Sequence, residues 1–143
     1  MHKQRLALSI LWWIWGLSLL GLQILLSYQT AIFGDNTAAA WEWFLPHISP
    51  TLMLVSAVAY KQRKEHTIPA NAHPYLFVLA LLVSIFYLLT LTVAALSVLF
   101  VTDPLGILQK SNIWLGPIQG LAASALGVFF AGDIEANSGA GSR

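Results

Sequence analysis

The chain has 143 residues, of which 57% are hydrophobic and 9% are charged, and its formal net charge is +1. An average soluble domain carries about 25% charged residues, so this composition excludes an ordinary water-soluble fold and places the chain in lipid. Cysteine is absent, which excludes disulfides, thiolate metal sites and dithiol redox chemistry.

The first apolar run, residues 6–28, contains no charged residue and is long enough to cross about 30 Å of hydrocarbon as a helix. A cleaved signal peptide is the alternative interpretation, because Lys3 and Arg5 precede the run. The run is, however, longer than the roughly 7 to 15 apolar residues that a signal peptide uses. We therefore expect a first transmembrane helix.

Residues 43–60 form the second predicted span, which is free of charge and contains Pro46, His47 and Pro50. Proline lacks a backbone N–H, so we expect the two prolines to kink or unwind the outer part of this helix and to free carbonyl groups.

A histidine at membrane depth is a functional candidate, because burying an ionisable group without a partner costs several kcal/mol. We expect a polar pocket formed by Glu42, His47 and Gln119. The alternative is that His47 lies at headgroup level and bonds to water or to a neighbouring carbonyl.

The third and fourth predicted spans are residues 74–101 and 111–132. Between them, residues 102–106 place Asp, Pro and Gly as in a type I turn, which we expect to end the third helix. Ser111 or Asn112 is then the expected cap of the fourth helix.

Polar residues recur on one face of the first and third spans, where they are expected to point into the bundle rather than at lipid. These residues are Ser9, Gly16, Gln23, Ser84, Tyr87 and Thr90.

Small residues line the fourth span. Gly116, Gly120 and Ser124 recur every four residues, and Ala123 and Gly127 do the same on the adjacent face. Such spacing lets a second helix approach closely enough for backbone contact, so these residues are predicted to pack against a helix. The partner helix belongs either to the same chain or to a second chain.

Lysine and arginine gather in alternate gaps between the apolar runs, which sets the orientation of a membrane protein. This pattern predicts an all-α integral membrane protein, a bundle of four transmembrane helices in the inner membrane with both termini cytoplasmic. The predicted cytoplasmic loop carries Lys61, Arg63 and Lys64, which serve as a topology signal or alternatively contact anionic lipid. Residues 133–143 are expected to form a flexible polar tail.

No nucleophile with a base, phosphate loop or metal-ligand spacing is present, and no charged residue lies in the middle of a span. An enzyme is therefore not favoured, and no cofactor and no nucleic-acid partner are expected. The leading hypothesis is a structural or assembly subunit that acts by helix packing, with membrane lipids and either copies of itself or a membrane or cytosolic protein as partners. The alternatives are a homo-oligomeric channel or pore-forming effector, and a lipid or small-molecule carrier or enzyme that uses the pocket near His47.

Overall fold

The computed structural model describes residues 2–64 and 74–131, and every element in these ranges is helical. The expected tail, residues 133–143, lies outside the described residues, as do the side chains of Lys61, Arg63 and Lys64. The elements in chain order are α1 (His2–Tyr28), α2 (Thr30–Phe33), η1 (Gly34–Asn36), α3 (Thr37–Lys64), α4 (Pro74–Ser97), η2 (Val98–Phe100) and α5 (Pro104–Ala131).

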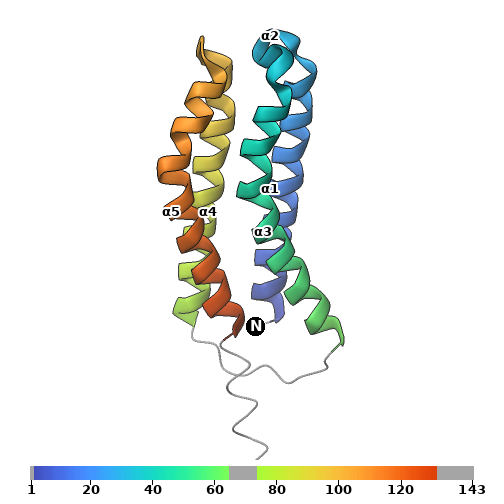
Figure 1. The fold of residues 1–143 in the computed structure, drawn as a ribbon. Helices are drawn as coiled ribbons and strands as arrows, with labels where there is room; N and C mark the ends of the chain where they lie inside the picture. The colour runs from blue at the N-terminus through green and yellow to red at the C-terminus, as the bar shows by residue number, and fades with distance from the viewer. Residues whose placement is uncertain (1, 65–73, 132–143) are drawn as a thin grey trace, which may run out of the picture.

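The four long helices form two antiparallel hairpins, α1 with α3 and α4 with α5, which stand side by side (Figure 1). Across the two hairpins, α3 packs against α5 and α1 packs against α4. The helices α3 and α4, which follow each other in the chain, are therefore diagonal partners in the bundle. We call the end that carries α2 and η1 the α2 end, and the opposite end, where α1 begins, the amino-terminal end.

Three helices are long and apolar enough to cross a membrane, and they cover Gln4–Tyr28, Tyr75–Phe100 and Pro104–Phe130. Helix α3 has 28 residues, as many as α5, but is less apolar because prolines, His47 and Thr51 interrupt its central part. The described part of the chain is thus a helical protein compatible with a membrane, with three spans identified by length and composition.

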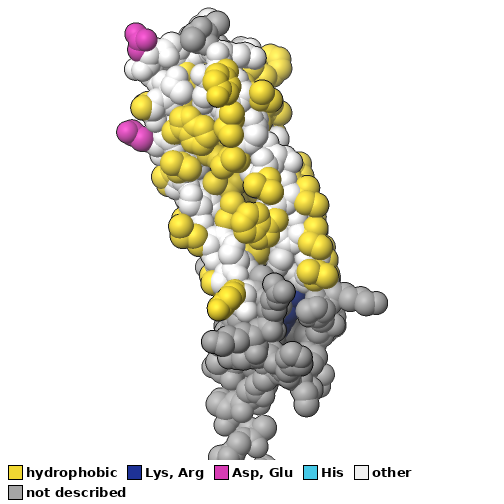
Figure 2. Space-filling view, turned by 90° about the vertical axis from the view of Figure 1, so that its right-hand side faces the viewer, with side chains coloured by type: hydrophobic (Ala, Val, Ile, Leu, Met, Phe, Trp, Pro, Cys, Tyr) yellow, Lys and Arg dark blue, Asp and Glu magenta, His cyan; other side chains and the backbone are white. Residues whose placement is uncertain are grey.

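The outer surface of the bundle is apolar, as a lipid environment requires. Ile14, Leu82, Val93 and Leu121 are all more than 60% exposed, although each is a large aliphatic side chain. Figure 2 shows apolar side chains along the described part of the α1 and α3 face, with acidic side chains visible toward the α2 end. Exposure of this extent is rare on soluble monomers.

The interior is filled by large side chains from all four long helices, and Trp12, Phe44, Tyr87, Leu115 and Leu126 are completely buried. Gly16 allows α1 to approach α3 closely, since a Cβ atom at this position would lie 3.2 Å from the Leu52 side chain. The small residue on α1 therefore determines how near the two helices of the first hairpin lie.

The start of α5 differs from the prediction. This helix begins at Pro104, and the backbone N–H of Gly106 donates to Asp103 Oδ1 at 3.0 Å. Asp103 is thus the residue that caps the helix, and Pro104 takes the first helical position, where its missing N–H has no cost. The expected cap at Ser111 or Asn112 is wrong, because both residues lie well inside α5.

Candidate functional site

The prolines of α3 do not unwind the helix, so this part of the prediction is wrong, but they do leave a backbone carbonyl free for another donor. The chain remains helical from Thr37 to Lys64 with Pro46 and Pro50 inside it. Pro50 has no N–H to donate to the carbonyl of Pro46, four residues earlier. Gln119 of α5 supplies the missing donor, and its Nε2 lies 2.9 Å from that carbonyl oxygen. A neighbouring helix thus satisfies the group that proline leaves free.

His47 is buried, with 7% of its surface exposed, and its Nδ1 lies 2.7 Å from the Trp43 carbonyl oxygen. Because a carbonyl oxygen only accepts hydrogen bonds, Nδ1 carries the proton in this contact. The Trp43 ring packs against the imidazole with centroids 5.2 Å apart. This geometry matches a histidine that bonds to its own helix.

The structure does not bring the three residues of the expected polar pocket together. Glu42 is exposed, and five residues of helix turn it away from the face that carries His47. Gln119 contacts the same segment of α3, but through the Pro46 carbonyl rather than through the histidine. The expected pocket is therefore replaced by an interhelical contact.

Hydrogen bonds from aromatic side chains link the two hairpins. Tyr87 donates its hydroxyl proton to the His47 carbonyl at 2.7 Å. Trp43 donates its indole N–H to Ser111 Oγ at 3.1 Å, and Trp15 donates to Thr92 Oγ1 at 3.0 Å. Sequence patterns did not reveal these pairs, since each joins residues far apart in the chain that share no motif.

The residues expected to face the interior divide into two groups. Gly16, Gln23, Ser84 and Tyr87 are buried in the bundle, and Ser9 and Thr90 are half-buried. Thr90 donates its hydroxyl proton to the Phe86 carbonyl of its own helix at 2.6 Å.

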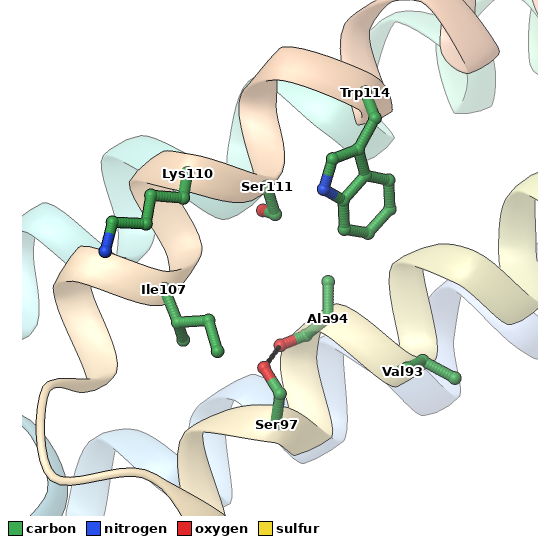
Figure 3. Close-up of a pocket in the computed structure, with 7 residues that line it drawn as sticks. All are labelled: Val93, Ala94, Ser97, Ile107, Lys110, Ser111 and Trp114. Atoms are coloured by element: carbon green, nitrogen blue, oxygen red, sulfur yellow. Dashed lines mark hydrogen bonds between the residues drawn. The ribbon is translucent and has the colours of Figure 1, made fainter.

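A shallow hollow of about 270 Å³ lies between α4 and α5 near the α2 end. Its lining is Val93, Ala94, Ser97, Ile107, Lys110, Ser111 and Trp114 (Figure 3). Its two hydroxyl groups already donate to carbonyls, Ser97 to Ala94 and Ser111 to Leu108. The Lys110 ammonium group extends away from the centre of the hollow in Figure 3, so the lining is mainly apolar and contains no acid–base pair.

The small residues of α5 face outward. Gly116, Gly120, Ala123 and Ser124 are exposed. A Cβ atom placed on Gly116, Gly120 or Gly127 would meet no atom within 4 Å. Helices α3 and α4 therefore pack on other faces of α5. We define the small-residue face as Gly116, Gly120, Ala123, Ser124 and Gly127, and no other helix of the described residues 2–64 and 74–131 covers it.

Among the described residues no group of three or more His, Asp or Glu side chains is arranged to hold a metal ion. Comparisons with protein-family models, with curated proteins and with solved structures found no match for this chain. Fold and surface together define a helical protein of the membrane-associated class, with a hydrogen-bonded interior and one open helix face.

Proposed function

We propose that this protein is a small multi-pass membrane protein that acts as a structural or assembly subunit through packing of α5. The observation that carries the proposal is the open space at Gly116, Gly120 and Gly127, where an added Cβ would meet nothing. Glycine in a helix interior costs roughly 0.5–1 kcal/mol relative to alanine. Three glycines on an open helix face therefore weaken α5 without any compensating contact from the described part of the chain.

The partner that best suits this face is α5 of a second copy. Gly116 and Gly120 form a small-xxx-small motif, which supports close packing of two helices in lipid. Large exposed side chains border the motif, with Ile113 79% and Leu121 65% exposed. Ridges of this kind beside a glycine groove allow two identical helices to interlock about a twofold axis.

We also propose that α3 is the fourth span and that both termini lie in the cytoplasm of a cell with an inner membrane. Helix α3 packs along α1 and α5, and its 28 residues reach about 42 Å at 1.5 Å per residue. Lys3, Arg5 and the basic residues at the end of α3 lie at the amino-terminal end of the bundle, whereas Lys110 is the one lysine or arginine of the described residues toward the α2 end. This charge asymmetry follows the positive-inside rule.

The mass of the purified protein, measured by light scattering with correction for detergent, tests the assembly proposal. We expect an oligomer for the natural sequence and a shift toward monomer for Gly120→Leu. The control is Gly21→Leu, because Gly21 lies on α1 and also has no atom within 4 Å of an added Cβ. A monomeric natural protein, or equal masses for both variants, would contradict assembly through α5.

A homo-oligomeric channel is the second candidate, supported by the polar side chains in the bundle interior, among them Gln23 and Ser84. It predicts solute leakage from liposomes that weakens in Gln23→Leu or Gln119→Leu, and unchanged flux in both variants would exclude a channel.

A lipid or small-molecule carrier is the third candidate, and the hollow between α4 and α5 supports it better than the surroundings of His47. Transport activity that survives His47→Ala would exclude a role for the histidine.

A further inference from the structure

Hydroxyl groups inside membrane helices usually bond to a carbonyl of their own helix, and most do so here. Ser18, Ser27, Ser56, Thr90 and Thr92 donate to the residue four positions earlier. Thr51 and Ser84 are different. They are 2% and 0% exposed, and neither hydroxyl has a hydrogen-bond partner in the described part of the chain.

The indole N–H of Trp12 is a third buried group without a partner, and this side chain is 0% exposed. The three groups come from three helices, α1, α3 and α4. Burying one such group without a hydrogen bond costs about 1–3 kcal/mol. Among the described residues, Gln23 Nε2 is also buried without a partner, but Gln23 lies about three helical turns from Trp12 on α1. The groups of Trp12, Thr51 and Ser84 therefore indicate a site rather than an isolated packing defect.

Tyr87 contacts the Trp12 ring and the turn of α3 that precedes Thr51, and it lies on the same helix as Ser84. The Trp12 and Tyr87 rings stack with centroids 6.0 Å apart. Ser84 precedes Tyr87 by three residues and so shares its face of α4. The Tyr87 hydroxyl reaches the carbonyl of His47, and Thr51 lies one turn further along the same face of α3.

Tyr87 also explains why the Thr51 hydroxyl is not satisfied within α3. The usual acceptor for a helical threonine is the carbonyl four residues earlier, which for Thr51 belongs to His47. That carbonyl accepts the Tyr87 hydroxyl at 2.7 Å. The Thr51 hydroxyl thus remains available to a ligand.

We propose that Trp12, Thr51 and Ser84 form a binding site for water at the centre of the bundle. A water molecule bonds at about 2.8 Å to each of its partners, so it links polar groups of different helices that do not bond to one another directly. The ligand accepts from the Trp12 indole and exchanges hydrogen bonds with two hydroxyls, as a water molecule does. None of the three side chains is charged, so the ligand is neutral. The site is independent of the assembly proposed for α5.

Magnetisation transfer from water to the Trp12 indole proton tests the site directly in the full chain, labelled with ¹⁵N in detergent micelles. The indole signal is assigned by its loss in Trp12→Phe. We expect a cross-peak between water and this proton, weakened at least twofold in Thr51→Val and in Ser84→Ala. Absence of the cross-peak in the natural protein would overturn the proposal.

Unfolding midpoints of the same variants provide a second, independent readout. A hydroxyl that binds water stabilises the fold, so Thr51→Val and Ser84→Ala should each lower the unfolding midpoint. The double variant should lower the midpoint by less than the sum of the two single shifts. The control is Ser56→Ala, whose hydroxyl already bonds to Leu52 of its own helix and should show no coupling to Ser84→Ala. If Thr51→Val and Ser84→Ala instead raised the unfolding midpoint additively, neither hydroxyl would bind water and the proposed site would be refuted.

Discussion

The side-chain amide of Gln119 donates to the carbonyl of Pro46, 2.9 Å away, which is the carbonyl that Pro50 cannot bond. This contact connects a sequence feature of α3 with a single polar residue of α5. It supplies the hydrogen bond that Pro50 cannot make within α3, which remains helical through this residue. It also attaches one hairpin to the other at a position where lipid offers no hydrogen bond.

We therefore predict that Gln119→Leu destabilises the bundle by about 1 kcal/mol, the usual size of an interhelical hydrogen bond in a membrane protein. Pro50→Ala restores a backbone N–H for the Pro46 carbonyl, so in that background Gln119→Leu should have a smaller effect. Unfolding by titration with sodium dodecyl sulfate measures both values. An equal loss in the two backgrounds would show that the amide acts through another contact.

The bond between Trp43 and Ser111 predicts energetic coupling between the hairpins. Trp43→Phe and Ser111→Ala should each destabilise the protein, and the double variant should lose less than the sum by about 0.5–1 kcal/mol. The same titration completes this double-mutant cycle. Strict additivity would mean that the 3.1 Å contact contributes nothing to stability.

Tyr87 has two separable roles, stacking on Trp12 and bonding to the His47 carbonyl. Tyr87→Phe removes only the hydroxyl and is expected to cost about 1 kcal/mol. Tyr87→Leu also removes the ring and should cost clearly more, since aromatic pairs contribute about 0.5–1.5 kcal/mol beyond burial. If the two variants were equally stable, the stacking would carry no energy.

The number of spans is tested with single cysteines, which the natural sequence lacks. Asn36 and Thr102 are exposed at the α2 end. If α3 crosses the membrane, Asn36→Cys and Thr102→Cys will be labelled from the same side by an impermeant maleimide, and Ser138→Cys from the cytoplasm. If α3 does not cross, the first two positions will be labelled from opposite sides.

Helix positions followed from the sequence where apolar runs are long, because length and hydropathy suffice to indicate a helix in lipid. The start of α5 was missed, since the turn signal around Asp103 and Pro104 also describes a helix cap. The inward position of Gln23 and Tyr87 agrees with a polar stripe. The Gln119 contact and the pair of Trp43 with Ser111 were not predictable, because they depend on which helices become neighbours.

The glycines of α5 also show what a sequence pattern leaves undetermined. Their spacing indicated close packing but not the partner, and only the three-dimensional arrangement shows that the other described helices leave this face open. Periodicity defines a face of a helix, whereas the order of helices around the bundle decides what covers that face. This order is a property of the whole chain.

The measurement that tests assembly through α5 most directly is disulfide cross-linking in native membranes, comparing Ser124→Cys with Gly21→Cys. Ser124 lies on the open small-residue face of α5, and Gly21 on an open part of α1. We predict that mild oxidation converts Ser124→Cys into a covalent dimer of twice the chain mass and leaves Gly21→Cys monomeric. A monomeric Ser124→Cys protein, or equal cross-linking at both positions, would contradict the proposed role of α5.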